Sequence, residues 1–348
     1  MPKLLLTGGC GFIGSNFVRF ALHRDPSLHI VNLDALTYSG NPDNLADLAD
    51  DARLADRYTF VHGSILDAAL LEKLLVGCDA VVHMAAESHV DRSILDSRPF
   101  IETNVLGTQT LLDAIRRVSK AGAFGGRLVH VSTDEVYGSL PLDQPDLKFT
   151  ETTPITANSP YSASKAASDL LVQAYHHTFG LNICITRCSN NFGPYQFPEK
   201  VIPLFVTNLI ENKRVALYGD GKNVRDWLHV DDHCEAILTV LEKGRSGEVY
   251  NIGGNNERSN LELTHAILNI MGKGLDMIQP VTDRLGHDRR YAIDPTKIQH
   301  ELGWQPSRSN WPGALEATVR WYVDHPLWWQ RVKSGAYRQY YQQQYEAR

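Results

Sequence analysis

The chain has 348 residues, of which 43% are hydrophobic and 21% charged, and its formal net charge at pH 7 is -6. This length predicts two units of ordinary domain size, and the composition is that of a globular protein. The sequence has no basic stripe of the kind that binds nucleic acid, and the apolar run at residues 4–6 is too short for a signal peptide or a membrane span. We therefore expect a cytoplasmic protein that has neither nucleic acid nor a membrane as its partner.

Five cysteines, at positions 10, 78, 184, 188 and 234, are scattered through the chain without a Cys-x-x-Cys pair. Their odd number and wide spacing favour reduced thiols in a reducing compartment. The fourteen histidines are also mostly scattered, and the adjacent pair His176 and His177 falls in a predicted helix, where a surface role is commoner than metal ligation. We expect no metal site.

Short apolar segments alternate with longer amphipathic ones through the first half of the chain. The predicted strands are residues 3–7, 30–34, 58–62, 80–83, 127–131 and 183–187. A helix is predicted from about residue 104 to 120, where Leu111, Leu112, Ile115 and Val118 recur at helical spacing. This alternation predicts an α/β fold with a doubly wound, Rossmann-type, mostly parallel sheet. Such sheets bind ligands at the carboxyl ends of their strands.

The alternation becomes irregular after about residue 190, where prolines and glycine-rich loops break the chain into smaller units. The predicted units are an NAD-binding domain over residues 1–189, a smaller α+β substrate-binding lobe mainly over 190–330, and a tail over 331–348. Residues 227–252 still follow a strand–helix–strand pattern, and we expect them to return to the main domain. Ser259 and Glu262 have the spacing of a capping box that opens a helix.

A glycine-rich turn, Gly-Gly-Cys-Gly-Phe-Ile-Gly over residues 8–14, lies between the first predicted strand and a predicted helix. Glycines at 8, 11 and 14 allow a tight turn, close approach of the backbone to a pyrophosphate and close helix packing. Asp34 ends the second predicted strand, where a carboxylate binds the adenosine ribose and repels a 2′-phosphate. NAD is therefore the predicted cofactor, and a purely structural glycine turn is the alternative.

Two further pairs of residues have the composition of a redox and acid–base site. Tyr161 and Lys165 are four apart and share one face of a predicted helix. A free phenol titrates near pH ~10, and the ammonium together with a nicotinamide ring would favour its anion. Asp134 and Glu135 are expected in an extended segment that points their carboxyls apart, with mutual repulsion separating them into one acid and one base. Taken alone, each pair is better explained as a surface feature, and only the combination with the glycine-rich turn and with Ser132-Thr133 favours catalysis.

The glycine spacing resembles the extended short-chain dehydrogenase/reductase family, as do Met84-Ala85-Ala86 and Thr103-Asn104. The resemblance narrows to nucleotide-sugar 4,6-dehydratases that act on dTDP-glucose. It extends to about Trp329 and is carried by the stretches at residues 85–93, 132–138, 187–195 and 286–291. One position departs, because that family has Asp where this chain has Ser64, which leaves the adenine contact open. Asp67 either compensates or caps a helix.

The resemblance implies oxidation at the sugar C4 by hydride transfer to NAD, loss of water across C5 and C6, and return of the hydride to C6. It implies that Tyr161, assisted by Thr133 and paired with Lys165, removes the O4 proton. Glu135 would take the C5 proton, and Asp134 would protonate the departing C6 hydroxyl. A UDP-sugar 4,6-dehydratase, a nucleotide-sugar 4-epimerase and a non-catalytic NAD-sensing protein are the alternatives. The acid pair disfavours an epimerase.

The resemblance also implies which residues bind the two ligands. For NAD they are Gly8, Gly11, Phe12, Ile13, Gly14, Asp34, Thr37, Ser64, Ile65, Ala85, Ala86, Thr103, Tyr161, Lys165 and Asn191. For the nucleotide sugar they are Ser88, Thr133, Asn190, Lys200, Tyr218, Arg225, Asn260, Asp283 and His287, with Arg284 and Arg290 near the same wall. Simpler roles stay open for Arg225 and Lys200, in surface salt bridges, and for Tyr218, in the core.

The resemblance further implies a homodimer, formed by a four-helix bundle of the helices near residues 104–120 and 162–179. On the second of these helices, Leu170, Leu171 and Val172 could face either a partner or the sheet.

Overall fold

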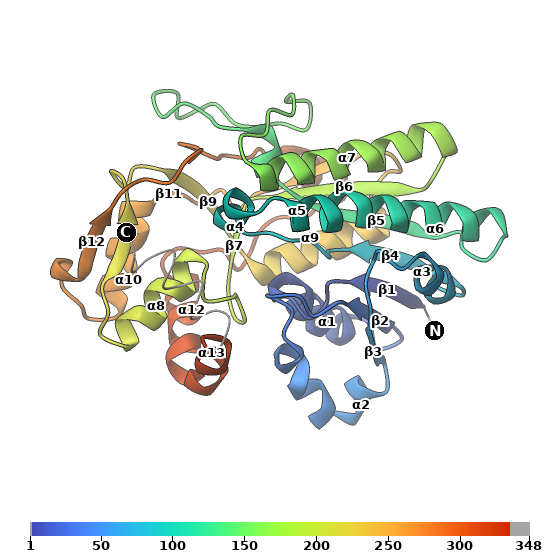
Figure 1. The fold of residues 1–348 in the computed structure, drawn as a ribbon, viewed down its shortest axis with the longest axis horizontal. Coiled ribbons are helices and arrows are strands. Elements are labelled where there is room, and N and C mark those ends of the chain that lie inside the picture. Colours follow the sequence, from blue (N-terminus) through green and yellow to red (C-terminus); the bar gives the residue numbers. More distant parts are fainter. Residues whose placement is uncertain (1, 335–348) are drawn as a thin grey trace.

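A seven-stranded sheet dominates the computed structural model, which describes residues 2–334 (Figure 1). The strand order is β10-β6-β5-β4-β1-β2-β3, and every neighbouring pair is parallel. The strands are β1 Lys3–Thr7, β2 His29–Asp34, β3 Tyr58–His62, β4 Ala80–His83, β5 Arg127–Thr133, β6 Ile183–Cys188 and β10 Val249–Ile252. The prediction of a doubly wound, mostly parallel sheet is confirmed.

Helices cover both faces of this sheet, so its central strands are buried on both sides and have nearly continuous apolar sequences. One face is covered by α1 (Phe12–Arg24), α9 (Val230–Lys243) and α11 (Thr296–Leu302), and the other by α3 (Ala68–Leu75), α6 (Thr108–Lys120) and α7 (Pro160–Phe179). Phe17 and Ile237 fill the first interface, and Leu111 and Val172 fill the second. The apolar stripe predicted for the helix near residues 104–120 is thus buried, with Leu111, Leu112, Ile115 and Val118 against the sheet.

The helix predicted from residue 104 starts differently from its prediction. After α4 (Val90–Leu95) and α5 (Arg98–Phe100), the segment Ile101–Gly107 has π-helical hydrogen bonding and passes directly into α6. Asn104 is buried in this segment, and its side-chain amide donates to Glu87 O at 2.9 Å and to Ser164 Oγ at 2.8 Å. The π-helical segment that precedes α6 thus brings the side chain of Asn104 into contact with α7.

The two adjacent acids do not lie in an extended segment, and that prediction was wrong. β5 ends at Thr133, and Asp134–Tyr137 form a 3-10 turn. The Thr133 hydroxyl accepts a hydrogen bond from Glu135 N at 3.3 Å, which caps the turn. The different surroundings of Asp134 and Glu135 therefore arise from a turn of the backbone, rather than from the pleat of a strand.

Two smaller sheets lie beside the main one (Figure 1). The first contains β7 (Asn190–Phe192), β9 (Val224–His229) and β11 (Glu257–Ser259), and the second contains β8 (Val215–Tyr218) and β12 (Ile278–Val281). Around them pack α8 (Val201–Ile210), α10 (Asn260–Ile270), α12 (Gly313–Asp324) and α13 (Pro326–Val332). The predicted capping box of α10 is confirmed, because Ser259 Oγ accepts from Glu262 N at 3.2 Å and Glu262 accepts from Ser259 N at 2.7 Å.

The segment expected to return to the main domain is divided between the sheets. α9 packs on the main sheet and β10 pairs with β6, whereas β9 joins the smaller three-stranded sheet. The domain boundaries themselves stay a prediction, and most of the predicted tail, residues 335–348, lies outside the described residues. No helix within residues 2–334 is long and apolar enough to cross a membrane.

A buried ion pair ties α7 to the main sheet. Arg187 of β6 donates from Nε to Asp169 of α7 at 2.8 Å, and both residues are fully enclosed. Burial acts to raise the pKa of Asp169, but the adjacent His130 and the charge of Arg187 outweigh it and lower that pKa to about 2. Arg187 Nη1 also donates to Tyr137 Oη, which donates to Asn251 Oδ1 at 2.8 Å. This network joins β6, α7, β10 and the turn after β5.

Candidate active site

The carboxyl ends of the main strands surround a cavity of about 410 Å³. It is lined by the glycine-rich turn, by the segments that follow β2, β3 and β4, and by Thr133, Tyr161 and Lys165. Every residue predicted to bind NAD lines this cavity, as do Ser88, Asn190 and Lys200 of the predicted substrate residues. The structure thus brings together groups that range from Gly8 to Lys200 in the sequence.

The glycine-rich turn fits a dinucleotide phosphate. Gly8 has φ +78°, and a Cβ there would lie 2.7 Å from the backbone of Ala85. A Cβ on Gly14 would lie 2.2 Å from Gly8 O, so both positions require glycine. Gly11 meets nothing closer than 3.4 Å, and α1 begins after it without a side-chain cap. The first backbone N–H groups of α1 are therefore available to an anion in the cavity.

Asp34 holds a carboxylate at the end of β2, on the cavity wall. Its Oδ2 accepts from Cys10 N and its Oδ1 from Leu36 N, both at 2.8 Å. Burial raises the pKa of Asp34, and the two backbone N–H groups oppose that rise. The carboxylate is thus fixed by the glycine-rich turn itself, at the place where the ribose of a dinucleotide is expected.

Ser64 lines the cavity, but its hydroxyl already accepts from Leu66 N at 3.1 Å. Asp67 does not line the cavity; its carboxylate caps α3 by accepting from Leu70 N at 3.0 Å. Of the two roles that the sequence left open for Asp67, the structure supports the helix cap. The adenine contact of Ser64 stays a prediction.

Tyr161 and Lys165 stand in the first turns of α7, behind a capping box at Ser159. Both side chains are buried, and Lys165 Nζ donates to Val131 O at 2.9 Å. Burial raises the pKa of Tyr161 well above its usual value, and the charge of Glu135 adds to the rise. The Thr133 hydroxyl opposes the shift by hydrogen bonding to the phenol. The expected lowering by Lys165 is therefore not produced by the protein groups alone, which hold Tyr161 neutral.

The acid pair has strongly unequal surroundings. Asp134 is 1% exposed, and within residues 2–334 its Oδ2 has no hydrogen-bond partner. Burial raises the pKa of Asp134 well above its usual value, and the charge of Glu135 raises it further. Burial also raises the pKa of Glu135, but the cations Arg284, Lys200 and Arg225 oppose that rise. Asp134 is therefore the natural proton donor of the pair and Glu135 the natural acceptor.

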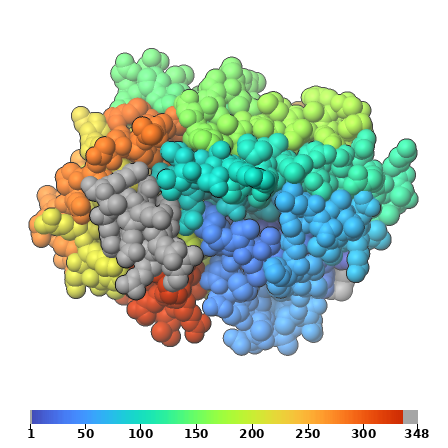
Figure 2. All heavy atoms as spheres, viewed as in Figure 1, coloured from blue at the N-terminus to red at the C-terminus, as the bar shows by residue number. Residues whose placement is uncertain are grey.

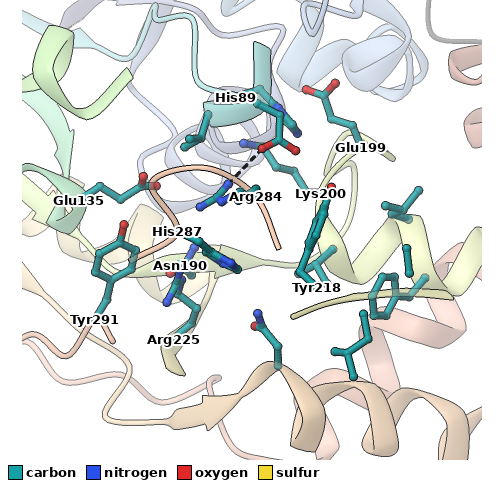
Figure 3. A pocket seen from close by; sticks show the side chains of 18 of the residues that line it. His89, Glu135, Asn190, Glu199, Lys200, Tyr218, Arg225, Arg284, His287 and Tyr291 are labelled. Carbon is teal, nitrogen blue, oxygen red and sulfur yellow. Dashed lines mark hydrogen bonds and ion pairs between the residues drawn. The ribbon is translucent and has the colours of Figure 1, made fainter. Parts of the chain in front are cut away.

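A second cavity, of about 170 Å³, shares part of its lining with the first and is shown in Figure 3. Glu135, Asn190 and Lys200 line both cavities. Figure 3 shows Glu135 and Tyr291 at one side and Tyr218 at the other, with basic side chains between them. The Asn190 Oδ1 atom is buried without a hydrogen-bond partner in the described part of the chain. The basic side chains of the second cavity can thus neutralise a bound anion, and Asn190 Oδ1 can accept a hydrogen bond from a ligand.

Arg225 lines the second cavity and makes no salt bridge to Asp226 or Asp220, so the simpler role proposed for it was wrong. It is 6% exposed, donates from Nη2 to Asp288 O at 3.0 Å and lies 4.2 Å above the Tyr291 ring. Asp220 pairs with Arg289 instead. The guanidinium of Arg225 is therefore a buried cation held by neutral groups.

Lys200 donates to Ser88 O at 3.0 Å, while the adjacent Glu199 binds Arg92 at 2.9 Å. Tyr218, Asn260 and His287 line the second cavity, and the Tyr218 ring meets the His287 ring edge-on. Asp283 lines neither cavity; its Oδ1 contacts His287 Nδ1 at 2.6 Å from behind. His287 therefore lies between Asp283 and the cavity, so Asp283 does not reach the substrate position predicted for it.

Arg284 lines the second cavity and contacts Asp91 across it at 3.4 Å, whereas Arg290 lies elsewhere and pairs with Glu257. The lining residues that the sequence did not assign include Tyr38, Ser39 and Gly40 of the first cavity and His89, Phe205 and Tyr291 of the second. His89 and Tyr291 fall within stretches that carry the family resemblance, so they could have been found. The described residues contain no group of three or more His, Cys, Asp or Glu that could hold a metal ion.

Comparison with known proteins extends the similarity over nearly the whole chain. The family model for GDP-mannose 4,6 dehydratase matches residues 5–311. A dTDP-glucose 4,6-dehydratase of Xanthomonas campestris pv. campestris (strain B100) is 53% identical, over 97% of this chain and 98% of the relative. The corresponding enzyme of Streptomyces niveus is 51% identical, over 95% and 96%.

Solved structures agree with these relatives. The crystal structure of dTDP-glucose 4,6-dehydratase from Streptomyces venezuelae, with NAD bound, has a TM-score of 0.89 and 52% identity, over 95% of this chain and 100% of that one. UDP-glucose 4-epimerase from Thermotoga maritima has a TM-score of 0.80 at 28% identity, over 92% and 99%. The fold is thus shared with both activities, while the sequence is much closer to the dehydratase.

The unequal surroundings of the acid pair predict a pH-dependent effect on stability. A native pKa raised above the unfolded value of about 3.9 means that folding favours protonated Asp134, so its cost to stability grows as the pH rises above that value. Asp134→Asn removes this cost. We expect the free energy of unfolding of Asp134→Asn to exceed that of the wild type at pH 7, with a difference that shrinks toward pH 4, in urea titrations.

Glu135→Gln is the matched control, because cations oppose the pKa rise of Glu135 and its gain at pH 7 should be smaller. A difference for Asp134→Asn that stays constant with pH, or that has the opposite sign, contradicts the assignment of Asp134 as the protonated acid.

Proposed function

Since the chain belongs to the GDP-mannose 4,6-dehydratase family and its relatives within it are dTDP-glucose 4,6-dehydratases, we propose that it converts dTDP-glucose to dTDP-4-keto-6-deoxy-glucose. This is a hydro-lyase reaction of deoxysugar biosynthesis. The observation that carries the proposal is the acid pair Asp134 and Glu135, which lies where the two cavities meet. One cavity then holds NAD, and the other holds the nucleotide.

The residues of the first cavity divide the oxidation between them. When bound, NAD accepts the C4 hydride and later returns it to C6. Tyr161 takes the O4 proton, and the Thr133 hydroxyl, which acts to lower the pKa of the phenol, assists it. Lys165 is buried beside them and fixed to Val131 O, so its ammonium adds positive charge to a dry site. The site excludes water from both steps, because Tyr161, Lys165 and Asp134 are each less than a tenth exposed.

The elimination then uses the two carboxyls in opposite protonation states. Oxidation at C4 acidifies the C5 hydrogen, and Glu135, the acceptor of the pair, takes it. Asp134, the donor, protonates the C6 hydroxyl as it leaves as water. The cations Arg284, Arg225 and Lys200 stabilise ionised Glu135 and line the second cavity, where they would also neutralise the pyrophosphate of a bound nucleotide sugar. Substrate binding and base strength are thereby set by the same groups.

We place the protein in the cytoplasm. All five cysteines are free and buried in the described structure, and burial raises the pKa of the Cys10 thiol to about 12 and that of Cys184 to about 11. Neutral buried thiols are inert and suit a reducing compartment. A fractionation that finds the protein outside the cytoplasm contradicts this placement.

The reaction itself is tested with purified protein, dTDP-glucose and no added NAD. We expect the product to have lost one water, by mass spectrometry, because the cofactor is regenerated in each turnover and stays bound. UDP-glucose in a parallel reaction measures the selectivity for the base, and we expect little or no loss of water from it. No loss of water from dTDP-glucose, with or without added NAD, contradicts the proposed function.

The roles of the two acids are separated by exchange in heavy water. Glu135→Gln should lower the rate of dehydration by at least about 100-fold, because it removes the general base. It should still oxidise C4, which raises the absorbance of reduced cofactor, and recovered substrate should contain no deuterium at C5.

Asp134→Asn is the matched variant, since it removes the acid and keeps the base. We expect similarly slow loss of water, but deuterium at C5 of the recovered sugar. Full turnover by Glu135→Gln, or deuterium at C5 in its recovered substrate, contradicts the assignment of Glu135 as the base.

We also propose a homodimer through the surface of α6 and α7. These helices pack against each other, and Tyr175 Oη of α7 donates to Asp113 of α6 at 2.9 Å. The two helices and the segment before α6 expose large apolar side chains at Leu106, Leu170 and Phe179, which are 50%, 54% and 45% exposed. Val172 faces the sheet and Leu170 faces away from it. An exposed leucine on the side of α7 that faces away from the sheet favours a partner surface there.

Leu170→Asp should convert the dimer to a monomer, because it would place a charge in the buried interface. Light scattering coupled to size-exclusion chromatography measures the mass of each form. Leu275→Asp is the control, since Leu275 is 64% exposed and lies far along the chain at Leu275–Met277. A wild-type protein that is monomeric, or a Leu170→Asp variant that remains dimeric, contradicts this interface.

A further inference from the structure

The outer wall of the first cavity is a loop that follows β2. Thr37, Tyr38, Ser39 and Gly40 of this loop line the cavity, and the loop continues into the 3-10 helix Pro42–Asp50. The wall lies against whatever the cavity binds, so movement of the wall eases the release of a bound cofactor. The contacts that hold the loop therefore bear on how long the cofactor stays.

Asn44 joins this loop to three other parts of the molecule. The residue is 2% exposed, and its Nδ2 donates to Cys10 O, in the glycine-rich turn, at 3.0 Å. Asn41 N donates to the same carbonyl at 3.0 Å, and Arg19 of α1 donates to Asn44 O. The remaining polar atom, Asn44 Oδ1, accepts from Nε1 of Trp328 at 2.8 Å. Trp328 belongs to α13, near the end of the described chain.

An aromatic cluster fixes the Trp328 indole in this position. Its ring lies edge-on to Trp321, with ring centroids 5.3 Å apart, and to Tyr195 at 5.7 Å. Tyr195 in turn contacts Trp321 at 4.7 Å, and the Arg19 guanidinium lies 4.2 Å from the centre of the Tyr195 ring. Figure 2 shows the red C-terminal helices against the blue N-terminal part of the chain. The indole N–H is thus held in line with Asn44 by rigid neighbours.

We propose that Trp328 is a positioning residue for cofactor retention, which locks the cavity wall by hydrogen bonding to Asn44. The inference rests on the proposed function, because it takes NAD as the bound cofactor. Trp328 lines neither cavity and touches no reacting group, so it acts only through Asn44 and Cys10. Opening the wall breaks the Trp328–Asn44 bond, and a part-buried hydrogen bond of this kind slows release by its own free energy.

The variant Trp328→Phe removes the N–H donor and keeps an aromatic ring in the cluster. We expect NAD to dissociate about three- to tenfold faster from it, as expected for one lost hydrogen bond. The rate of dissociation is measured from the exchange of bound NAD for isotope-labelled NAD in solution. Samples are passed through a desalting column to separate bound from free cofactor. Hydrogen exchange measured by mass spectrometry should also be faster in residues 41–50, where Asn41 N donates to Cys10 O and Asn44 N to Asn41 O.

Trp329→Phe is the matched control. Trp329 is next in the chain, is buried, and donates from Nε1 to Tyr322 O at 2.9 Å without contacting the loop. It should lower stability to at least the same degree, and leave NAD dissociation and loop exchange unchanged.

Two outcomes overturn the proposal and they are distinguishable. Wild-type protein that holds no NAD contradicts the proposed function, and the lock fails with it. If the wild type retains NAD and Trp328→Phe releases it at the same rate, the role of Trp328 alone is contradicted. The same holds if Trp329→Phe accelerates release as much as Trp328→Phe does.

Discussion

The site depends on the buried ion pair between Arg187 and Asp169. A buried charge that loses its partner costs several kcal/mol, roughly 3–5, so the elements that supply the pair cannot shift independently. Through Tyr137 and Asn251 the same network reaches the turn after β5 and the edge strand β10. Tyr161 and Lys165 on α7 are thereby kept in register with the acids that follow β5. The relative placement of redox and elimination groups is a property of the core, rather than of the cavity surface.

Charges from the smaller sheets then give the two adjacent acids different protonation states. Both carboxyls are buried, and burial alone would keep both protonated. Three cations oppose this effect at Glu135. Arg225 belongs to β9, Lys200 directly precedes α8, and Arg284 follows β12. At Asp134 the first neighbouring charge is Glu135 itself, which adds to the effect of burial. The substrate-binding side of the molecule therefore tunes the chemistry as well as holding the nucleotide.

The sequence predicted most of the features that depend on local pattern. Strand limits agree to within two residues for β1 to β6, and the glycine-rich turn required no tertiary information. It failed where the outcome depends on packing at a distance. The 3-10 turn at Asp134 depends on a cap by Thr133 at the end of β5, and Asp283 lies behind His287 because of a loop path that no periodic pattern encodes.

The contact between Asn44 and Trp328 shows the same limit most clearly, because 284 residues separate its partners. The contact also lies away from the acid pair, so cofactor retention and acid–base chemistry depend on different parts of the chain. The cofactor wall is held by the beginning and the end of the described chain, whereas the acid pair is governed by its middle. Contacts at Asn44 can therefore change how long the cofactor stays without altering the protonation of Asp134 or Glu135. Cofactor retention depends on the Asn44 contacts, and catalysis depends on the acid pair. The two are linked through the cavity that holds the cofactor, so a substitution can change the rate of cofactor release with little effect on the protonation of the acids.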